Sequence, residues 1–151
     1  MKKMIQLFTV SALAMLISTA SAQTTVKRYG SEQSIIATAI WVGDTLYLSG
    51  QLPATMAGDT KTQTISTLNV IQNILKEHGL GMSDVVQMRV YLVGDPAQAG
   101  RLDFAGMNEA YKQFFGTKEQ PNKPVRATIQ AAALVVPGAL VEIEVVAVRS
   151  K

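Results

Sequence analysis

The sequence predicts an α+β fold in which two helices lie on one face of a mixed β-sheet. Five stretches are β-rich or alternate apolar with polar residues, as strands do. Two further stretches place apolar residues three or four positions apart, as amphipathic helices do. Their order along the chain is strand, strand, helix, strand, helix, strand, strand, which favours a mixed sheet with both helices on one side.

The first two strands are predicted to form a hairpin. Residues 35–42 are β-rich, residues 45–49 alternate, and Gly43-Asp44 between them is a turn signal. A loop that carries two glycines and a proline follows at residues 50–59. The chain therefore leaves the hairpin through an irregular segment before the first helix.

The first helix is predicted to begin near Asp59 or Thr60, because either side chain is a suitable N-cap, and to run to about His78. Gly79 then supplies the left-handed backbone with which many helices end. The apolar positions of this segment recur at helical steps, at Ile65, Leu68, Ile71 and Leu75. One side of the helix is therefore expected to pack on the sheet.

Residues 84–93 predict the next strand, because their side chains alternate. One side carries Val86, Met88, Val90 and Leu92, and the other carries Gln87, Arg89 and Tyr91. Aromatic and apolar residues at helical steps predict a second helix from Phe104 to about Phe114. Two final strands are predicted at residues 125–134 and 140–148, joined through a turn at Pro137-Gly138.

The face of the sheet opposite the helices has no cover within this chain. Several strands contribute aliphatic residues to it, and a single domain of this length has no third layer. We therefore expect another copy of the chain to cover this face.

The first 22 residues have the plan of a secretory signal peptide. Basic residues lie within positions 1–3, an apolar run follows at 5–17, and Ala20-Ser21-Ala22 suits a signal peptidase. The run is shorter than the roughly 20 residues that a membrane helix needs. Cleavage after Ala22 leaves one domain, residues 23–151, without a membrane anchor in the periplasm or the medium; an uncleaved anchor is the alternative.

Composition argues against several classes of function. The chain has 14 Lys and Arg against 11 Asp and Glu, and loss of Lys2 and Lys3 with the signal leaves 12 against 11. No basic stripe with interleaved aromatic residues is present, so nucleic acid is a poor candidate partner. Because the sequence has no cysteine and one histidine, disulfides and a zinc site are not expected.

Arg126 is the first candidate for a ligand-binding residue. Alternation puts it on one side of its strand together with Thr128 and Gln130, within an otherwise apolar stretch. A guanidinium is costly to bury without a partner, and its planar fork fits a carboxylate. We expect a carboxylate ligand or an internal acidic partner; exposure on an edge strand is the alternative.

Glu142 and Glu144 share one side of the last strand, where the other residues are apolar. Two interpretations are open. In the first, one of these glutamates forms a structural ion pair with Arg126 or Arg149. In the second, a carboxylate that is shielded from water acts as a general acid or base. A Glu142 carboxylate that faces an open pocket would support turnover, whereas one held by either arginine would support a structural or binding role.

Ser49-Gly50 and Asn108 are weaker candidates. The first pair closes a strand, where a hydroxyl and exposed amides can receive a ligand oxygen, and Asn108 lies on the second helix between core positions. The only imidazole, His78, ends a helix, and no general base is visible near Ser49 in the sequence. The sequence therefore does not indicate a catalytic triad with Ser49 as the nucleophile.

Four segments together resemble the Rid family, the reactive imine deaminases that are also called YjgF-like, across nearly the whole of residues 23–151. They are Leu48-Ser49-Gly50-Gln51-Leu52-Pro53, Met107-Asn108-Glu109-Ala110-Tyr111 with Phe114-Phe115, Pro124-Val125-Arg126-Ala127-Thr128, and Val141-Glu142-Ile143-Glu144-Val145. The resemblance implies a chorismate-mutase-like fold that forms a homotrimer with a pocket at each subunit interface.

The resemblance also implies an activity and the residues that perform it. Family members hydrolyse 2-imino acids such as 2-aminoacrylate to a 2-keto acid and ammonium, without a cofactor or metal. The arginine at the position of Arg126 holds the substrate carboxylate, and the glutamate at Glu142 positions or activates water. Asn108, Thr128 and the Ser49-Gly50 turn match further pocket positions.

Some features depart from the family pattern. Ile36 stands where family enzymes commonly have a tyrosine, and Thr128 stands where a cysteine is common. The signal peptide is a further departure, because the familiar role of the family is cytosolic. The main alternative is therefore a non-catalytic trimer that binds a small carboxylate as a sensor or scavenger.

Two other functions are less favoured. A chaperone-like or partner-binding protein would need an exposed apolar patch on the trimer surface. Ribonuclease activity has been attached to relatives, but the weak basic character of residues 23–151 and the single histidine argue against it.

Overall fold

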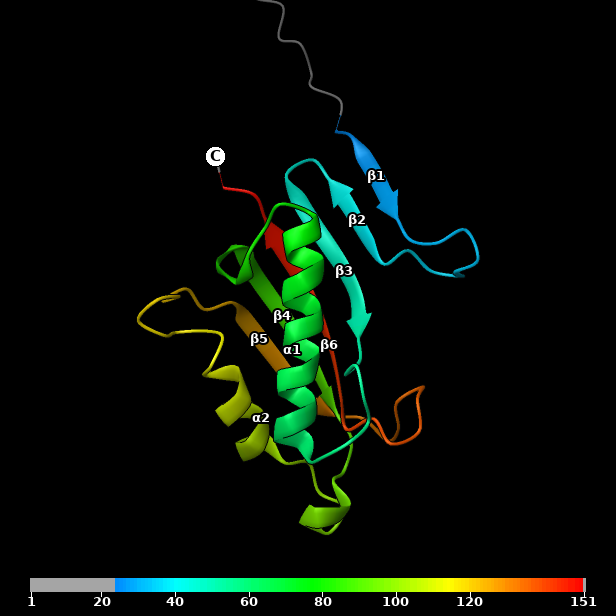
Figure 1. Ribbon diagram of the computed structural model, residues 1–151, viewed down its shortest axis with the longest axis vertical. Helices are drawn as coiled ribbons and strands as arrows, with labels where there is room; N and C mark the ends of the chain where they lie inside the picture. Colours follow the sequence, from blue (N-terminus) through cyan, green and yellow to red (C-terminus); the bar gives the residue numbers. More distant parts are fainter. Residues whose placement is uncertain (1–23, 151) are drawn as a thin grey trace, which may run out of the picture.

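The computed structural model describes residues 24–150, so the predicted signal peptide at 1–22 lies outside the described part. Both helices lie on one face of a single mixed sheet, as the sequence predicts (Figure 1). The strands are β1 (Val26–Tyr29), β2 (Ala39–Val42), β3 (Thr45–Gln51), β4 (Val85–Leu92), β5 (Val125–Gln130) and β6 (Val141–Val148). The helices are α1 (Thr60–Glu77) and α2 (Phe104–Tyr111), with short 3₁₀ turns η1 (Met82–Asp84) and η2 (Pro96–Gln98).

The sheet order is β1-β2-β3-β6-β4-β5. Only β4 and β5 are parallel, and α2 lies in the connection between them. The predicted turn at Pro137-Gly138 is present, but it does not join neighbouring strands, because β4 lies between β5 and β6. Strand β6 is central because it pairs with β3 on one side and with β4 on the other, and its inner side is wholly buried.

Helix α1 has the predicted ends. Asp59 is the N-cap, and its carboxylate accepts a hydrogen bond from the backbone N–H of Thr62 at 2.8 Å. Gly79 has a φ of 71°, and the N–H of Leu80 donates to the carbonyl of Leu75 at 2.9 Å, as in a Schellman motif. These contacts satisfy backbone groups that the helix itself leaves unpaired.

The core lies between α1 and the inner face of the sheet (Figure 1). Leu68, Ile71 and Leu75 of α1 are fully buried there. They share this core with inward residues of the three central strands, namely Leu46, Leu48, Met88, Val90, Leu92, Val141, Ile143, Val145 and Ala147. Burial of this apolar surface is the main source of the stability of the domain.

Several boundaries differ from the sequence prediction. Strand β5 ends at Gln130 rather than near Leu134, because its pairing with β4 ends at Leu92. Strand β1 was not predicted, because all four of its residues are exposed and show no apolar alternation. Strand β2 begins at Ala39 rather than Ile35, which is fully exposed. Helix α2 ends at Tyr111, and the chain continues through turns to Phe115, whose side chain is buried.

Two irregularities of register change the direction of side chains. The β4–β6 pairing shifts between Val85 and Gln87, so Val86 is 46% exposed and does not share the buried side with Met88 as predicted. Ser49, Gly50 and Gln51 close β3 as predicted, and the β3–β6 pairing shifts between Leu48 and Gln51, so Ser49-Gly50 lies at an irregularity of the pairing.

The face opposite the helices carries exposed apolar side chains, as the sequence predicts. Tyr47, Val125 and Ile129 are each about half exposed or more on this face. Val146 and Val148 of β6 lie on the same side and are partly exposed. We call this side of the sheet the open face.

No helix within residues 24–150 is long and apolar enough to cross a membrane.

Candidate functional site

Arg126 of β5 points toward α2 and has uncharged neighbours. Its Nη2 donates to the Asn108 side-chain oxygen at 2.7 Å, and its Nη1 lies 3.6 Å from the sulfur of Met107. The two ion pairs within residues 24–150 join other residues, so the predicted internal acidic partner of Arg126 is not there. A guanidinium with remaining donors and no carboxylate beside it is suited to bind an anionic ligand.

Aromatic rings of α2 support the guanidinium. Its central carbon lies 4.5 Å from the ring centre of Tyr111 and 5.8 Å from that of Phe104, within the range of cation–π contacts. Burial raises the pKa of the Tyr111 hydroxyl, and the nearby charge of Arg126 opposes this shift. Tyr111 is therefore a neutral platform at neutral pH.

From the sequence, these rings were used only to predict the second helix, although their spacing also indicated the site. Phe104, Asn108 and Tyr111 are four and three residues apart, so they lie on one side of α2. Asn108 thus marks the side of the helix that faces Arg126, together with both rings.

Thr128 lies on the same side of β5 as Arg126. In the described part of the chain its hydroxyl oxygen is buried and has no hydrogen-bond partner. Residues two apart on a strand are separated by about 7 Å. Because a buried hydroxyl is usually hydrogen-bonded, this one is suited to a ligand held by Arg126.

Glu142 lies on the open face, directly beside the Gly50 backbone. A Cβ atom at position 50 would overlap the Glu142 carboxylate and would lie 2.8 Å from its Cδ. Glycine at this position therefore leaves the space that the Glu142 carboxylate occupies. Neither ion pair within residues 24–150 involves Glu142, so the alternative in which it pairs with Arg126 or Arg149 is not the one observed.

Arg149 and Ser49 have other partners. The guanidinium of Arg149 stacks on Trp41, with 4.4 Å from its central carbon to the ring centre, and donates to the His78 carbonyl. The Ser49 hydroxyl donates to the Ala37 carbonyl at 2.6 Å and so holds the segment before β2. Ser49 is therefore a positioning group for the Gly50 segment, and no imidazole accompanies it.

Glu144, the other acidic residue of β6, pairs with Arg89 of β4 at 2.6 Å. The Tyr91 hydroxyl donates to the same carboxylate oxygen at 3.1 Å. Burial and this carboxylate raise the pKa of Tyr91. Sequence analysis placed Arg89 and Tyr91 on one side of their strand, but it did not identify Glu144 as their partner, because the pairing of β4 with β6 is not evident from either strand alone.

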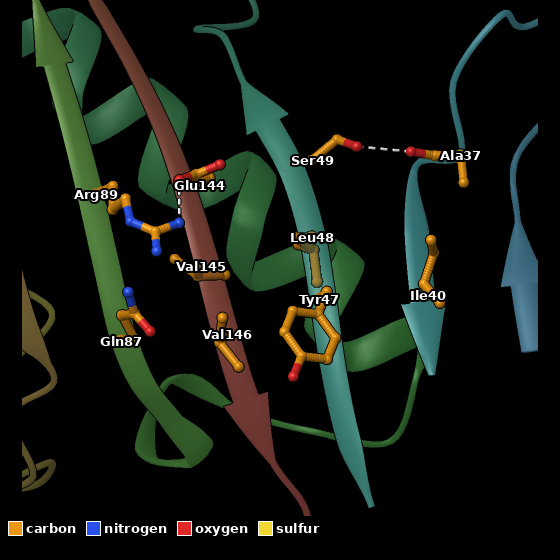
Figure 2. A pocket seen from close by; sticks show the side chains of 10 residues that line it. All are labelled: Ala37, Ile40, Tyr47, Leu48, Ser49, Gln87, Arg89, Glu144, Val145 and Val146. Atoms are coloured by element: carbon orange, nitrogen blue, oxygen red, sulfur yellow. Dashed lines mark hydrogen bonds and ion pairs between the residues drawn. The ribbon is translucent and has the colours of Figure 1, made fainter. Parts of the chain in front are cut away.

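This ion pair borders a shallow pocket of about 230 Å³ on the open face. Figure 2 shows Arg89 and Glu144 on one side of the pocket and Ser49 on the other, with its hydroxyl directed to Ala37. The remainder is mostly apolar and includes Ile40, Tyr47 and Val146, with the polar side chain of Gln87 beside Arg89.

The candidate residues form two clusters on opposite faces of the sheet. The helix-side cluster is Arg126, Asn108 and Thr128; the open-face cluster is Ser49, Gly50 and Glu142. Met88 is in register with both Arg126 and Val145, whose side chains point toward the helices, whereas Glu142 is opposite Tyr91 on the open face. A single chain therefore does not bring Arg126 and Glu142 into one pocket.

Within residues 24–150, no group of three His, Cys, Asp or Glu side chains is arranged to hold a metal ion. The groups available for chemistry are therefore a cation, a carboxylate, an amide and two hydroxyls.

The sequence pattern that defines a known family, described as endoribonuclease L-PSP, matches residues 27–149. A 2-iminobutanoate/2-iminopropanoate deaminase of Capra hircus is 35% identical over 145 residues, covering 92% of this chain and 93% of the relative. A RutC family protein of Pyrococcus abyssi is 34% identical over 117 residues, covering 74% of this chain and 84% of the relative. The crystal structure of Escherichia coli TdcF with bound serine is similar, with a TM-score of 0.67 and 30% identity, and covers 82% of this chain and 94% of that chain.

Proposed function

The chain belongs to the endoribonuclease L-PSP family, and on this basis we propose that it is a deaminase of reactive 2-imino acids and their enamine forms. Its products are a 2-keto acid and ammonium. The relative from Capra hircus is named as a deaminase of 2-iminobutanoate and 2-iminopropanoate, which are substrates of this class.

The proposal depends on the environment of Arg126. It is a partly buried cation held by Asn108 and by two aromatic rings, without an acidic partner in the described part of the chain. A small carboxylate supplies the missing negative charge and accepts two parallel hydrogen bonds from the guanidinium. The unpartnered Thr128 hydroxyl offers a further contact to the same ligand.

The proposed chemistry needs orientation and proton transfer rather than a cofactor. The imine carbon is already electrophilic, so Glu142 is required only to hold a water molecule and accept its proton. Water adds to the C=N carbon, the nitrogen takes up protons, and the C–N bond breaks to release ammonium. The carbon retains the oxygen as the carbonyl of the keto acid.

We further propose that the site is completed between subunits of a homotrimer. Within one chain, Arg126 and Glu142 lie on opposite faces of the sheet and cannot contact the same ligand. In the trimer, Arg126 of one copy and Glu142 of its neighbour face one ligand. The exposed apolar residues of the open face, such as Val125 and Ile129, supply the surface for such an assembly.

The test is release of ammonium from 2-aminoacrylate that is generated in situ. The purified protein is expected to accelerate the release, and Arg126→Ala is expected to lose most of this acceleration. Arg126→Lys keeps the charge but not the planar fork, so it should retain only part of the activity. If the unchanged protein does not accelerate ammonium release, the deaminase proposal is wrong.

A second candidate is a trimer that binds a small carboxylate without turnover. The observation that favours it is that the cluster around Arg126 is complete within one chain, without Glu142. Binding of pyruvate that depends on Arg126, together with no acceleration of ammonium release, would identify this function.

Ribonuclease activity, which the family description names, is less favoured for this chain. Its only histidine, His78, contacts Trp41 and Tyr29, apart from both clusters. The helix-side cluster holds a single cation, whereas an RNA-binding groove needs several along the phosphate backbone.

We also propose that the protein is exported and acts in the periplasm or the medium after cleavage following Ala22. The basic, apolar and small-residue segments of positions 1–22 support this location. N-terminal sequencing of protein from the extracytoplasmic fraction is expected to begin at Gln23. An N-terminus at Met1, or recovery only from the cytoplasm, would contradict the proposal.

A further inference from the structure

A second hollow, of about 780 Å³, lies at the end of the sheet where α1 ends. We call it the β1–α1 groove. Its wall on the strand side includes Lys27, Tyr29 and Trp41, and its wall on the helix side includes Glu77 and His78. None of the residues proposed for deamination lines it.

The groove exists because the sheet extends beyond α1. Lys27 is in register with Trp41 and Tyr29 with Ala39, so these side chains lie on the helix side of β1 and β2. Figure 1 shows β1 and β2 lying to one side of α1, with its last turn beside β2. The helix-side surface of these two strands therefore forms the floor of the groove.

Aromatic rings at the groove are held by specific contacts. The Trp41 indole N–H donates to Nδ1 of His78 at 3.4 Å, and the Tyr29 ring meets the His78 ring edge-on, with 4.6 Å between centres. Arg149 stacks on Trp41 and donates to the His78 carbonyl at 3.1 Å. An apolar or aromatic ligand group thus meets an ordered surface, which lowers the entropic cost of binding.

Charges of both signs line the same groove. Lys27 and Arg149 are cations from the strand side, and Glu77 is an anion from the last turn of α1. Neither ion pair within residues 24–150 involves them. The C-terminal end of a helix also favours a positive group. A ligand that carries a carboxylate and an ammonium group complements this arrangement.

We propose that the β1–α1 groove binds an α-amino acid with an aromatic side chain. Lys27 and Arg149 receive its carboxylate, Glu77 receives its ammonium group, and Tyr29 contacts its side chain. This inference does not depend on the proposed deaminase function. Strands β1 and β5 are the two edges of the sheet, so β1 lies about 24 Å from the strand that carries Arg126 at the usual spacing of strands.

Trp41 is the only tryptophan of the chain, and it borders the groove, so its fluorescence reports binding there. L-phenylalanine, which does not absorb at the red edge of tryptophan absorption, is the probe. Its titration into the purified protein is expected to give a saturable change in emission. 3-Phenylpropionate lacks the ammonium group and phenethylamine lacks the carboxylate, so each should bind roughly three- to tenfold more weakly.

Two variants test which ligand group Glu77 and Lys27 each bind. Glu77→Gln should weaken L-phenylalanine but not 3-phenylpropionate, and Lys27→Gln should weaken L-phenylalanine but not phenethylamine. Lys76→Gln is the matched control, because Lys76 is an exposed neighbour of Glu77 that does not line the groove. The proposal is overturned if no saturable change occurs, if 3-phenylpropionate binds as well as L-phenylalanine, or if Arg126→Ala abolishes the signal while Lys27→Gln does not.

Discussion

Single side chains in this domain differ in whether their polar groups are satisfied. Buried threonines of α1 donate to carbonyls within the helix, as Thr67 does to Gln63 at 2.9 Å. The Thr128 hydroxyl, two residues from Arg126, is buried without a partner in the described part of the chain. Such a group lowers stability unless a ligand or water supplies the missing bond.

Thr128→Val is therefore expected to separate stability from function. Valine has nearly the shape of threonine, so removal of the unpaired hydroxyl should leave the melting temperature unchanged or raise it. The KM for 2-aminoacrylate should rise, because one ligand contact is lost. Thermal unfolding and the kinetics of ammonium release measure the two effects.

The control for Thr128→Val is Thr67→Val, which removes a hydrogen-bonded hydroxyl from α1. This change should lower stability by about 1 kcal/mol without a change in KM. An unchanged KM together with clearly lower stability in Thr128→Val would contradict a ligand-binding role for this hydroxyl.

Gly50→Ala is expected to displace the Glu142 carboxylate. The added methyl group would overlap that carboxylate, which must then rotate away from its present position. Catalytic groups tolerate little misplacement, so kcat should fall roughly 10- to 100-fold. The rate of ammonium release at saturating substrate is the measurement.

Gly81→Ala is the matched control for Gly50→Ala, because its new methyl group would lie 3.7 Å or more from the atoms of non-adjacent residues. Near-wild-type activity is expected for this control. Full activity in Gly50→Ala would show that the observed position of Glu142 is not needed for turnover.

At the level of elements, periodic segments were predicted well and irregular ones were not. Helix α1 was predicted because its apolar spacing and both of its caps are local. Strand β1 was missed because its pairing with β2, not its own alternation, makes it a strand. The central place of β6 depends on contacts between segments far apart in sequence, which no local pattern encodes.

The N-cap of α1 gives a prediction about pH. The hydrogen bonds from Thr62 hold the pKa of Asp59 below its ordinary value of 3.8. A depressed pKa contributes stability above the ordinary value, and this contribution is lost as pH falls through the folded-state value. Asp59→Ala should therefore cost about 1 kcal/mol at neutral pH and much less in acid.

Denaturant unfolding of Asp59→Ala and of the unchanged protein at several pH values measures this difference. Asp59→Asn is the control, because asparagine caps a helix without a charge, so its stability should not show the same loss in acid. A cost of Asp59→Ala that stays constant as pH falls would contradict the ionised cap.

For the whole molecule, the two faces of the sheet decide what one chain can do. Alternation correctly grouped Arg126 with Thr128 and Glu142 with Glu144, but it did not reveal that these groups lie on opposite faces. That fact depends on the strand order and on which face the helices cover. The candidate residues were therefore predictable from sequence, whereas their separation into two clusters on opposite faces of the sheet was not.

Complementation between inactive variants tests whether the helix-side cluster of one subunit and the open-face cluster of another form one site. Arg126→Ala and Glu142→Gln are each expected to be folded and nearly inactive. In a cyclic trimer that contains both variants, one interface brings an intact Arg126 to an intact Glu142. Each mixed trimer therefore has one intact site of three, so the isolated mixed assemblies should recover about a third of the wild-type rate of ammonium release.

Co-expression with two different affinity tags isolates the mixed assemblies. The control replaces Glu142→Gln by the double variant Arg126→Ala/Glu142→Gln, which supplies no intact Arg126 and should restore nothing. If both single variants are inactive and their mixed assemblies remain so, Arg126 and Glu142 do not meet across the interface. Recovery would instead support the proposed trimer, in which the neighbour that covers the open face also contributes half of each site.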